Sequence, residues 1–323
     1  MYTDIHCHTA GAGYGGSGCF VSPGLRNNWR YDAFLKAFGV TDDDLSFYGD
    51  EVVIQRLSVN IAESKFVSKA VVLAMDGVYG ADGRLDKSKT EVYIPNDYLG
   101  RTLAYYPNLF FGASVNPSRP DALDELDRVK AAGAVLVKWL PSVMGFDPAD
   151  RRNAAFYRKL ASLGLPLLTH TGSEFSFTHS DDGLALPSKL RLALEQGVTV
   201  IAAHAGASGS EDGVPNMDVL IGMFGEYDNL YADISSLTQI NKAGSLPRLL
   251  AHTGYHGRLL YGSDMPLINT GLVSPMWYPR RLGIMKTLGI TFEENAWDRD
   301  VRLKKELGVP EIVFTNPGKM LRI

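Results

Sequence analysis

The sequence predicts an α/β protein whose 323 residues form a single domain, a distorted (β/α)8 TIM barrel with an insertion after its first strand. Two observations lead to this fold class: eight short apolar segments recur along the chain, and patterns typical of helices lie between most of them. Most of the apolar segments are continuous rather than alternating, which is typical of parallel strands buried on both faces. Eight such strands with helical connections favour a closed barrel over an open, doubly wound sheet.

The predicted strands share this apolar character, and they span residues 2–8, 69–75, 108–115, 134–140, 166–171, 199–204, 229–234 and 258–263. The clearest helix begins at Pro120-Asp121 and ends before Gly133, because proline and glycine commonly mark the two ends of a helix. The predicted helices span residues 120–132, 149–163, 187–196, 215–226, 245–253 and 275–288.

Two long connections, residues 9–50 and 76–100, interrupt this alternation. Both follow the carboxyl ends of predicted strands, where barrel enzymes place their active sites. We interpret them as a lid or a wall of the substrate pocket; an oligomer contact or a passive excursion is the open alternative. Residues 11–16 match G-x-G-x-x-G, but no helix begins there, so a dinucleotide site is excluded. We expect these glycines to form a mobile segment over the site.

The composition excludes several classes of function. Hydrophobic residues make up 45% of the chain and the net charge is −4, with no dominant basic patch, so we expect no nucleic-acid partner. The longest apolar stretches, such as 199–205, are too short to cross a membrane. Cys7 and Cys19 make no disulfide framework. We therefore expect a cytoplasmic protein that acts on a small molecule, with a homo-oligomer left open.

The first predicted strand contains His6-Cys7-His8. Residues two apart on a strand point to the same face, so both imidazoles can converge on one ion. Cys7 should then face the opposite way and pack into the barrel wall. A single His-x-His is weak evidence, but this pair ends the first strand and a glycine-rich segment follows it directly.

Polar residues able to bind a metal also end later strands. Lys138 and His170 are 32 residues apart, His170 and His204 are 34 apart, and Asp264 follows after 60, or two steps of 30. These steps match the length of a βα unit, so the side chains should lie at one level of the barrel. Charged or imidazole groups are costly at buried strand ends unless a partner such as a metal ion is present. Imidazole and carboxylate ligands without a cysteine set indicate Zn²⁺, or Mn²⁺, Fe²⁺ or Co²⁺.

The chain resembles the amidohydrolase superfamily, in the amidohydrolase-related branch that includes aminocarboxymuconate-semialdehyde decarboxylase. The resemblance covers essentially the whole chain and rests on the segments DIHCH, KWLPS, LTHTG, AAHAG, GSD and FTNPGKML. This combination is specific for the superfamily but not for a substrate.

The resemblance implies that one metal ion is held by His6, His8, His170 and Asp264. Asp264 would also take a proton from the attacking water, and His204 would act as a general acid or base, or as a ligand of a second ion. Lys138 matches the position at which some members carry a carboxylated lysine that bridges two ions. The alternative is a Lys138 ammonium paired with Asp233 or Glu174, which leaves one ion, and we expect one.

A hydrolase that activates water to cleave an amide, lactone or ester bond of a small anionic molecule is the expected function. A metal-dependent non-oxidative decarboxylase on the same barrel is the alternative, and a barrel that binds a ligand without turnover is a third hypothesis. Arg26 and Arg30 of the insertion could contact an anionic substrate. Four further candidates for substrate contact lie near strand ends: Asp76, Trp139, Glu174 and His179.

Overall fold

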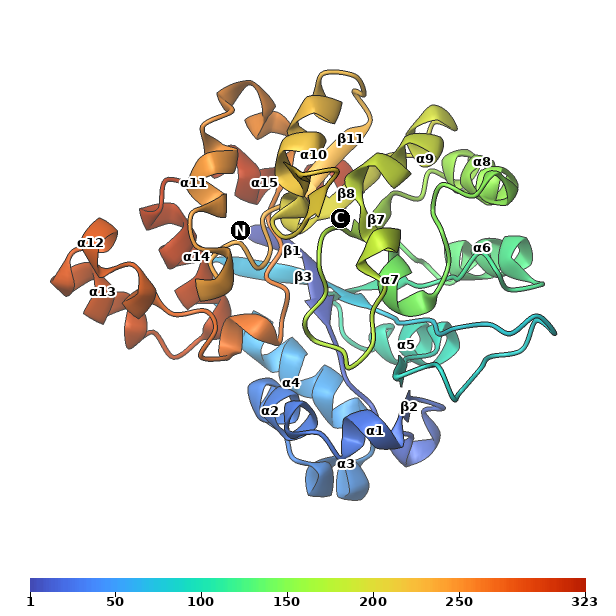
Figure 1. The fold of residues 1–323 in the computed structure, drawn as a ribbon. Coiled ribbons are helices and arrows are strands. Elements are labelled where there is room, and N and C mark those ends of the chain that lie inside the picture. Colours follow the sequence, from blue (N-terminus) through green and yellow to red (C-terminus); the bar gives the residue numbers. More distant parts are fainter.

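A computed structural model describes residues 1–323 and confirms the predicted barrel (Figure 1). Eight parallel strands lie in the order β1-β3-β5-β6-β7-β8-β11-β12. Each predicted strand is present, with bounds that shift by a few residues. They are β1 (Tyr2–His8), β3 (Val67–Leu73), β5 (Leu109–Ala113), β6 (Leu136–Trp139), β7 (Leu167–His170), β8 (Val200–Ala203), β11 (Leu230–Asp233) and β12 (Leu259–Leu260).

The barrel closes between its first strand and the segment that follows its last strand. The amide of Asp264 donates to the carbonyl of His6 at 2.8 Å, and the amide of His8 donates to the carbonyl of Met265 at 2.9 Å. Strand β12 itself is only two residues long, so these bonds replace a regular ladder. Closure therefore fixes Asp264 directly beside the two histidines of β1.

Helices surround the sheet as an outer layer (Figure 1). Four predicted helices are confirmed, and 187–196 is a 3-10 turn, Pro187–Leu190, that continues into α9. The layer consists of α4 (Glu51–Ala62), α5 (Asn96–Leu103), α6 (Ala122–Ala131), α8 (Ala154–Leu163), α9 (Arg191–Glu195), α10 (Asn216–Phe224), α11 (Ser245–Leu250), α14 (Ala296–Glu306) and α15 (Glu311–Leu321). No helix is long and apolar enough to cross a membrane.

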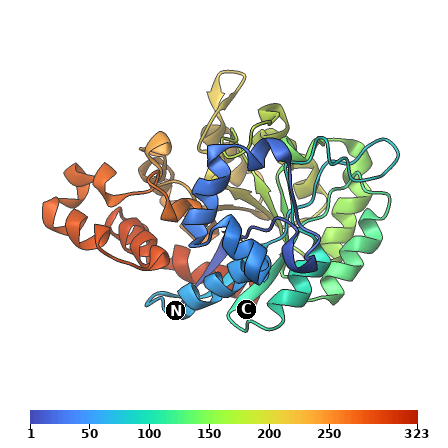
Figure 2. The same ribbon diagram turned by 90° about the horizontal axis from the view of Figure 1, so that it is seen from below.

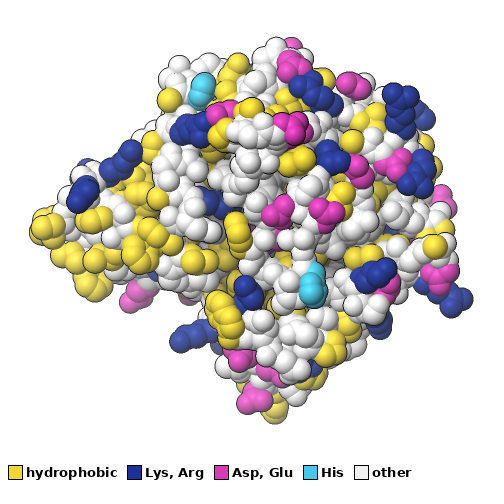
Figure 3. Space-filling model, viewed as in Figure 1, with side chains coloured by type: hydrophobic (Ala, Val, Ile, Leu, Met, Phe, Trp, Pro, Cys, Tyr) yellow, Lys and Arg dark blue, Asp and Glu magenta, His cyan; other side chains and the backbone are white.

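The prediction of a single helix over 275–288 is wrong. The segment forms a 3-10 turn, then α12 (Pro279–Leu282) and α13 (Ile284–Thr291). Gly283 has φ 75° and ψ 158°, far from helical values, and it separates the two short helices. This arm protrudes from the barrel and exposes several apolar side chains, Ile284, Met285 and Phe292 among them (Figures 2 and 3).

The insertion 9–50 is largely helical. It contains α1 (Pro23–Arg26), α2 (Trp29–Phe38) and α3 (Asp42–Tyr48), which pack together on one side of the barrel in both views (Figures 1 and 2). Strand β2 (Phe20–Val21) pairs antiparallel with β4 (Val92–Tyr93) of the second long connection. The two interruptions of the sequence pattern are therefore joined to each other.

The glycine-rich segment 11–18 is held by hydrogen bonds to Asp50, whereas the sequence predicted a mobile segment. The buried carboxylate of Asp50 accepts hydrogen bonds from the amides of Ala12 and Gly13, at 3.0 and 2.9 Å, and from Ser17 Oγ at 2.5 Å. A Cβ atom on Gly11 would lie 2.7 Å from Cys19 Sγ, so glycine is needed for this close approach. The glycines therefore allow a tight fold around Asp50.

We predict that Asp50→Ala lowers the free energy of unfolding by about 3 kcal/mol, because it leaves three donors without their acceptor. It should also raise KM, since the segment adjoins the cavity described below. Urea unfolding measures the first effect. Asp43→Ala, which removes an exposed carboxylate of the same insertion, is the control and should change stability little. Equal stabilities of the two variants would restore the mobile interpretation.

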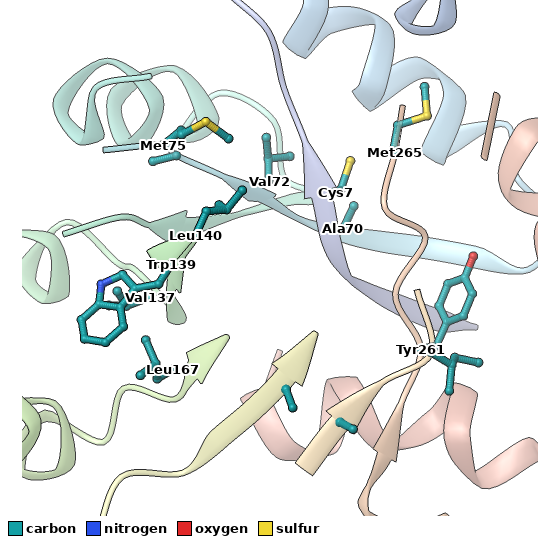
Figure 4. Close-up of a cluster of buried hydrophobic side chains, with 14 of the residues drawn as sticks. Cys7, Ala70, Val72, Met75, Val137, Trp139, Leu140, Leu167, Tyr261 and Met265 are labelled. Carbon is teal, nitrogen blue, oxygen red and sulfur yellow. The ribbon is translucent and has the colours of Figure 1, made fainter. Parts of the chain in front are cut away.

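Two apolar cores lie on the two sides of the sheet. Nine buried residues fill the barrel interior, among them Leu136, Leu168 and Ile201. A much larger cluster packs the outside of the strands against the helices, and Figure 4 shows Cys7 and Trp139 within it. The prediction that Cys7 packs into the wall is thus confirmed.

Candidate metal centre

Three side chains meet at the carboxyl ends of the strands. His6 Nε2 lies 3.2 Å from His8 Nε2, and each of these nitrogens lies 3.4 Å from Asp264 Oδ1. His204 also belongs here, because ligand atoms of His6, His204 and Asp264 all lie within 4.8 Å of one another. Imidazole nitrogens and a carboxylate oxygen that converge at such distances suit a divalent transition metal.

The strand pattern places these side chains at one level. On β6 and β7, the apolar residues Leu136 and Leu168 point into the barrel, and Lys138 and His170 follow them two positions later on the same face. The polar groups therefore lie one layer above the apolar interior, as the spacing of about one βα unit predicts.

Backbone strain also shapes the centre. His204, Ser236 and Asp264 have φ values of 60°, 60° and 62°, although none is glycine. Left-handed backbone at non-glycine residues costs about 1–3 kcal/mol and persists where surrounding structure holds it. Each of these residues follows a barrel strand, so the chain turns sharply there and aims the side chain at the centre rather than along the strand.

Asp233, at the end of β11, orients His6. Its Oδ2 accepts a hydrogen bond from His6 Nδ1 at 2.7 Å, and its Oδ1 accepts from the amides of His204 and Ser235 at 2.8 and 3.1 Å. The pKa of the Asp233 carboxyl is lowered despite its burial, because His6 and His204 stabilise the anion. A proton held on Nδ1 leaves Nε2 of His6 as the free ligand atom.

Two consecutive serines complete this network. Ser235 Oγ donates to Asp233 and lies 2.8 Å from His204 Nδ1, so it can accept a hydrogen bond from His204 when Nδ1 carries the ring proton. Ser236 Oγ donates to Asp264 Oδ2. Sequence reasoning missed both serines; their position two and three residues after a strand that ends in aspartate was the available signal.

Burial favours the neutral form of three histidines near the centre, which is the form that binds a metal. Burial lowers the pKa values of His8 and His170, and it lowers that of His204 well below its usual value, with the nearby Lys242 ammonium adding to the shift. The pKa of Asp264 is well below its usual range in spite of burial, because His204 and His6 stabilise the anion.

His170 lies beside this group rather than within it. Its Nε2 is 3.2 Å from the carbonyl of Gly172, its Nδ1 is 3.5 Å from Glu174, and its ring packs against the edge of His204. Lys138 is buried with Nζ 3.0 Å from His6 Nε2, and burial lowers its pKa to about 8. The expected ion pair of Lys138 with Asp233 or Glu174 is absent.

A cavity of about 150 Å³ opens onto the centre. This is roughly ten times the space that one water molecule needs, so a small organic molecule fits. His8, His204 and Asp264 contribute to its polar part. Apolar side chains of the insertion form much of the remaining wall, among them Leu25 of α1 and Phe34 of α2. The insertion thus forms part of the pocket, as one of the two sequence interpretations proposed.

Only Glu174 among the four predicted substrate contacts lines the cavity. Trp139 follows Lys138 on β6 and so points outward, where its indole donates to the carbonyl of Val115 at 2.6 Å. The carboxylate of Asp76 accepts hydrogen bonds from the amides of Gly77 and Asn116, at 2.9 and 2.8 Å, and the residue lies outside the cavity lining.

His179, the fourth predicted contact, is exposed on the loop after β7. Its amide donates to Glu91 Oε1 at 2.8 Å, and the residue lies outside the cavity lining.

Comparison with known proteins places this site in a family context. A family model described as amidohydrolase matches residues 67–284, which is about two thirds of the chain. No curated protein matches the sequence significantly.

Solved structures share the fold over nearly the whole chain. An uncharacterised TIM-barrel protein from Bordetella bronchiseptica is 16% identical, with a TM-score of 0.58, over 94% of this chain and 99% of its own. A candidate 2-pyrone-4,6-dicarboxylic acid hydrolase from Pseudomonas putida is 14% identical (TM-score 0.55; 99% and 97% covered). A 5-carboxyvanillate decarboxylase from Sphingomonas paucimobilis is 11% identical (TM-score 0.55; 100% and 99% covered). At these identities the likeness concerns the fold alone.

Proposed function

The chain belongs to the amidohydrolase family, and from this premise we propose that it is a metal-dependent hydrolase that cleaves an amide, lactone or ester bond of a small anionic molecule. We further propose that His6, His8 and Asp264 hold one ion, most suitably Zn²⁺, and that His170 is the fourth ligand implied by the family pattern. The mutual distances of 3.2 and 3.4 Å among the first three support this choice. An ion bound there would lower the pKa of water toward 7 and polarise a carbonyl group.

The position of Asp264 carries the proposal. Its Oδ1 lies 3.4 Å from Nε2 of both His6 and His8, so a carboxylate stands beside the proposed ion, where it can accept a proton from the attacking water. His204, a neutral imidazole beside it, can orient or stabilise the carbonyl oxygen through a hydrogen bond.

Metal content is the first test. We expect the purified protein to bind about one divalent ion per chain, as open catalytic sites do, measured by elemental analysis after dialysis against Zn²⁺. His6→Ala should lose most of this ion, whereas His179→Ala, which removes an exposed histidine, should keep it. Two ions at saturation would instead promote Lys138 and His204 to ligands of a second ion. A metal-free protein of normal activity would end the proposal.

Reaction products separate the two chemistries. Incubation of the metal-loaded protein with a panel of small carboxylated esters, lactones and amides should release a new carboxylic acid without CO₂. Release of CO₂ from any carboxylated aromatic acid, with no hydrolysis, would favour the decarboxylase. Metal binding without turnover of either kind would favour a ligand-binding barrel.

A further inference from the structure

Lys242 is a buried lysine that faces the cavity and has no partner in the protein. It ends the 3-10 turn Ile240–Lys242 that follows β11, it is 8% exposed, and it lines the cavity together with His204 and Asp264. Its ammonium group makes no hydrogen bond and no ion pair. The carboxylates of Asp264, Glu174 and Asp233 attract it from a distance, but none lies in contact with it.

The other buried lysines show what is missing. Lys304 donates to Asp300 at 2.7 Å and to the carbonyl of Gly262 at 3.0 Å, and Lys138 lies 3.0 Å from His6 Nε2. A buried charge without a partner is strongly unfavourable. Because Lys242 lines the cavity, an anionic group of a molecule bound there can supply the missing partner.

The two arginines of the insertion do not take this role. Arg26 pairs with Asp42 at 2.7 Å and Arg30 lies over the ring of Trp29, and neither lines the cavity. The expectation that these arginines contact an anionic substrate is therefore not supported by the geometry. Apart from Lys138, which lies against His6, Lys242 is the only lysine or arginine that lines the cavity.

We propose that Lys242 binds a carboxylate group of the substrate and so selects small apolar carboxylates. The lining of the same cavity supports this class, since Tyr31, Phe34 and Phe38 of α2 offer an apolar surface to the body of the molecule. A single ammonium, with no arginine in the lining, suits one carboxylate better than a phosphate, which brings three strong acceptor oxygens. The inference rests on the proposed function, because the bond to be cleaved must reach the metal centre while this carboxylate contacts Lys242.

Binding of inert probes tests the role of Lys242 without turnover. The probes are succinate, glutarate and isophthalate, each paired with its own monoamide, and calorimetry measures their Kd for the metal-loaded protein. Both members of a pair can place one carboxylate at the metal centre, but only the diacid has a second one for Lys242. We expect the best-bound diacid to bind at least about tenfold more tightly than its monoamide, the range of a charged hydrogen bond.

Two variants make the assignment specific. Lys242→Met should abolish the difference between diacid and monoamide, whereas Lys242→Arg should keep most of it. The Tm of Lys242→Met should not fall, because the variant removes an uncompensated buried charge. Equal binding of diacid and monoamide by the wild type, a difference that survives in Lys242→Met, or a marked fall in Tm would each overturn the proposal.

The outcome is separable from that of the proposed function. Selective binding of diacids through Lys242 by a protein that hydrolyses nothing would keep this inference and remove the hydrolase. Hydrolysis of carboxylated esters with the same kcat/KM in wild type and Lys242→Met would keep the hydrolase and remove the role of Lys242.

Discussion

Asp264→Asn should lower kcat by roughly 100- to 10,000-fold, the usual contribution of a general base, while the protein stays folded and retains much of its metal. The amide still fills the same space beside His6 and His8, and Ser236 Oγ can still donate to its oxygen. It cannot accept the proton from the attacking water. Turnover of a confirmed substrate, with metal content measured on the same sample, gives the result.

Asp76→Asn is the matched control for this variant. Asp76 is also a buried carboxylate just beyond a barrel strand, and it accepts hydrogen bonds from the amides of Gly77 and Asn116, but it does not line the cavity. Its replacement should lower stability and leave kcat per folded molecule close to that of the wild type. If Asp264→Asn keeps full activity, Asp264 is not the base and the hydrolase mechanism fails with it.

The sequence predicts the barrel well because its signals are local. A strand buried on both faces needs a continuous apolar segment, and a helix needs start and stop residues, so each element is visible within its own short window. The polar residue at the end of each strand is visible in the same way. Closure of the sheet then brings His6, His8 and Asp264 together, as Asp264 contacts β1 through backbone hydrogen bonds.

The rest of the site depends on contacts that no local pattern records. Lys242 lies nine positions beyond the end of β11, in a segment without periodicity, and only the path of that loop brings it to the cavity. Trp139 and Lys138 are adjacent in the sequence, yet the pleat of β6 sends one outward and the other inward. The hydrogen bonds that hold the glycine-rich segment at Asp50 likewise join residues almost forty positions apart.

Asp233→Asn should lower metal affinity about 10- to 100-fold, the usual effect of removing a group that orients a metal-binding histidine. Both oxygens of Asp233 act as acceptors: Oδ2 for His6 Nδ1, and Oδ1 for the amides of His204 and Ser235. An asparagine has one acceptor and one donor at these positions, so one set of donors must face an NH₂ group. His6 then loses the bond that directs Nε2 to the centre, although no proposed ligand has been removed.

The pH dependence of stability separates this effect from simple damage to the fold. The folded pKa of Asp233 is depressed below the unfolded value of about 3.9, because His6 and His204 stabilise its anion. Its stabilising contribution is therefore fully present above that pH and is lost as the pH falls toward the folded pKa. In urea unfolding with a chelator present, Asp233→Asn should be less stable than wild type at pH 7, and the gap should narrow below pH of about 4. The Asp76→Asn variant should lose stability without loss of metal affinity. In the wild type, burial raises the pKa of the Asp76 carboxyl. Equal metal affinities of Asp233→Asn and wild type would show that His6 needs no orientation by Asp233.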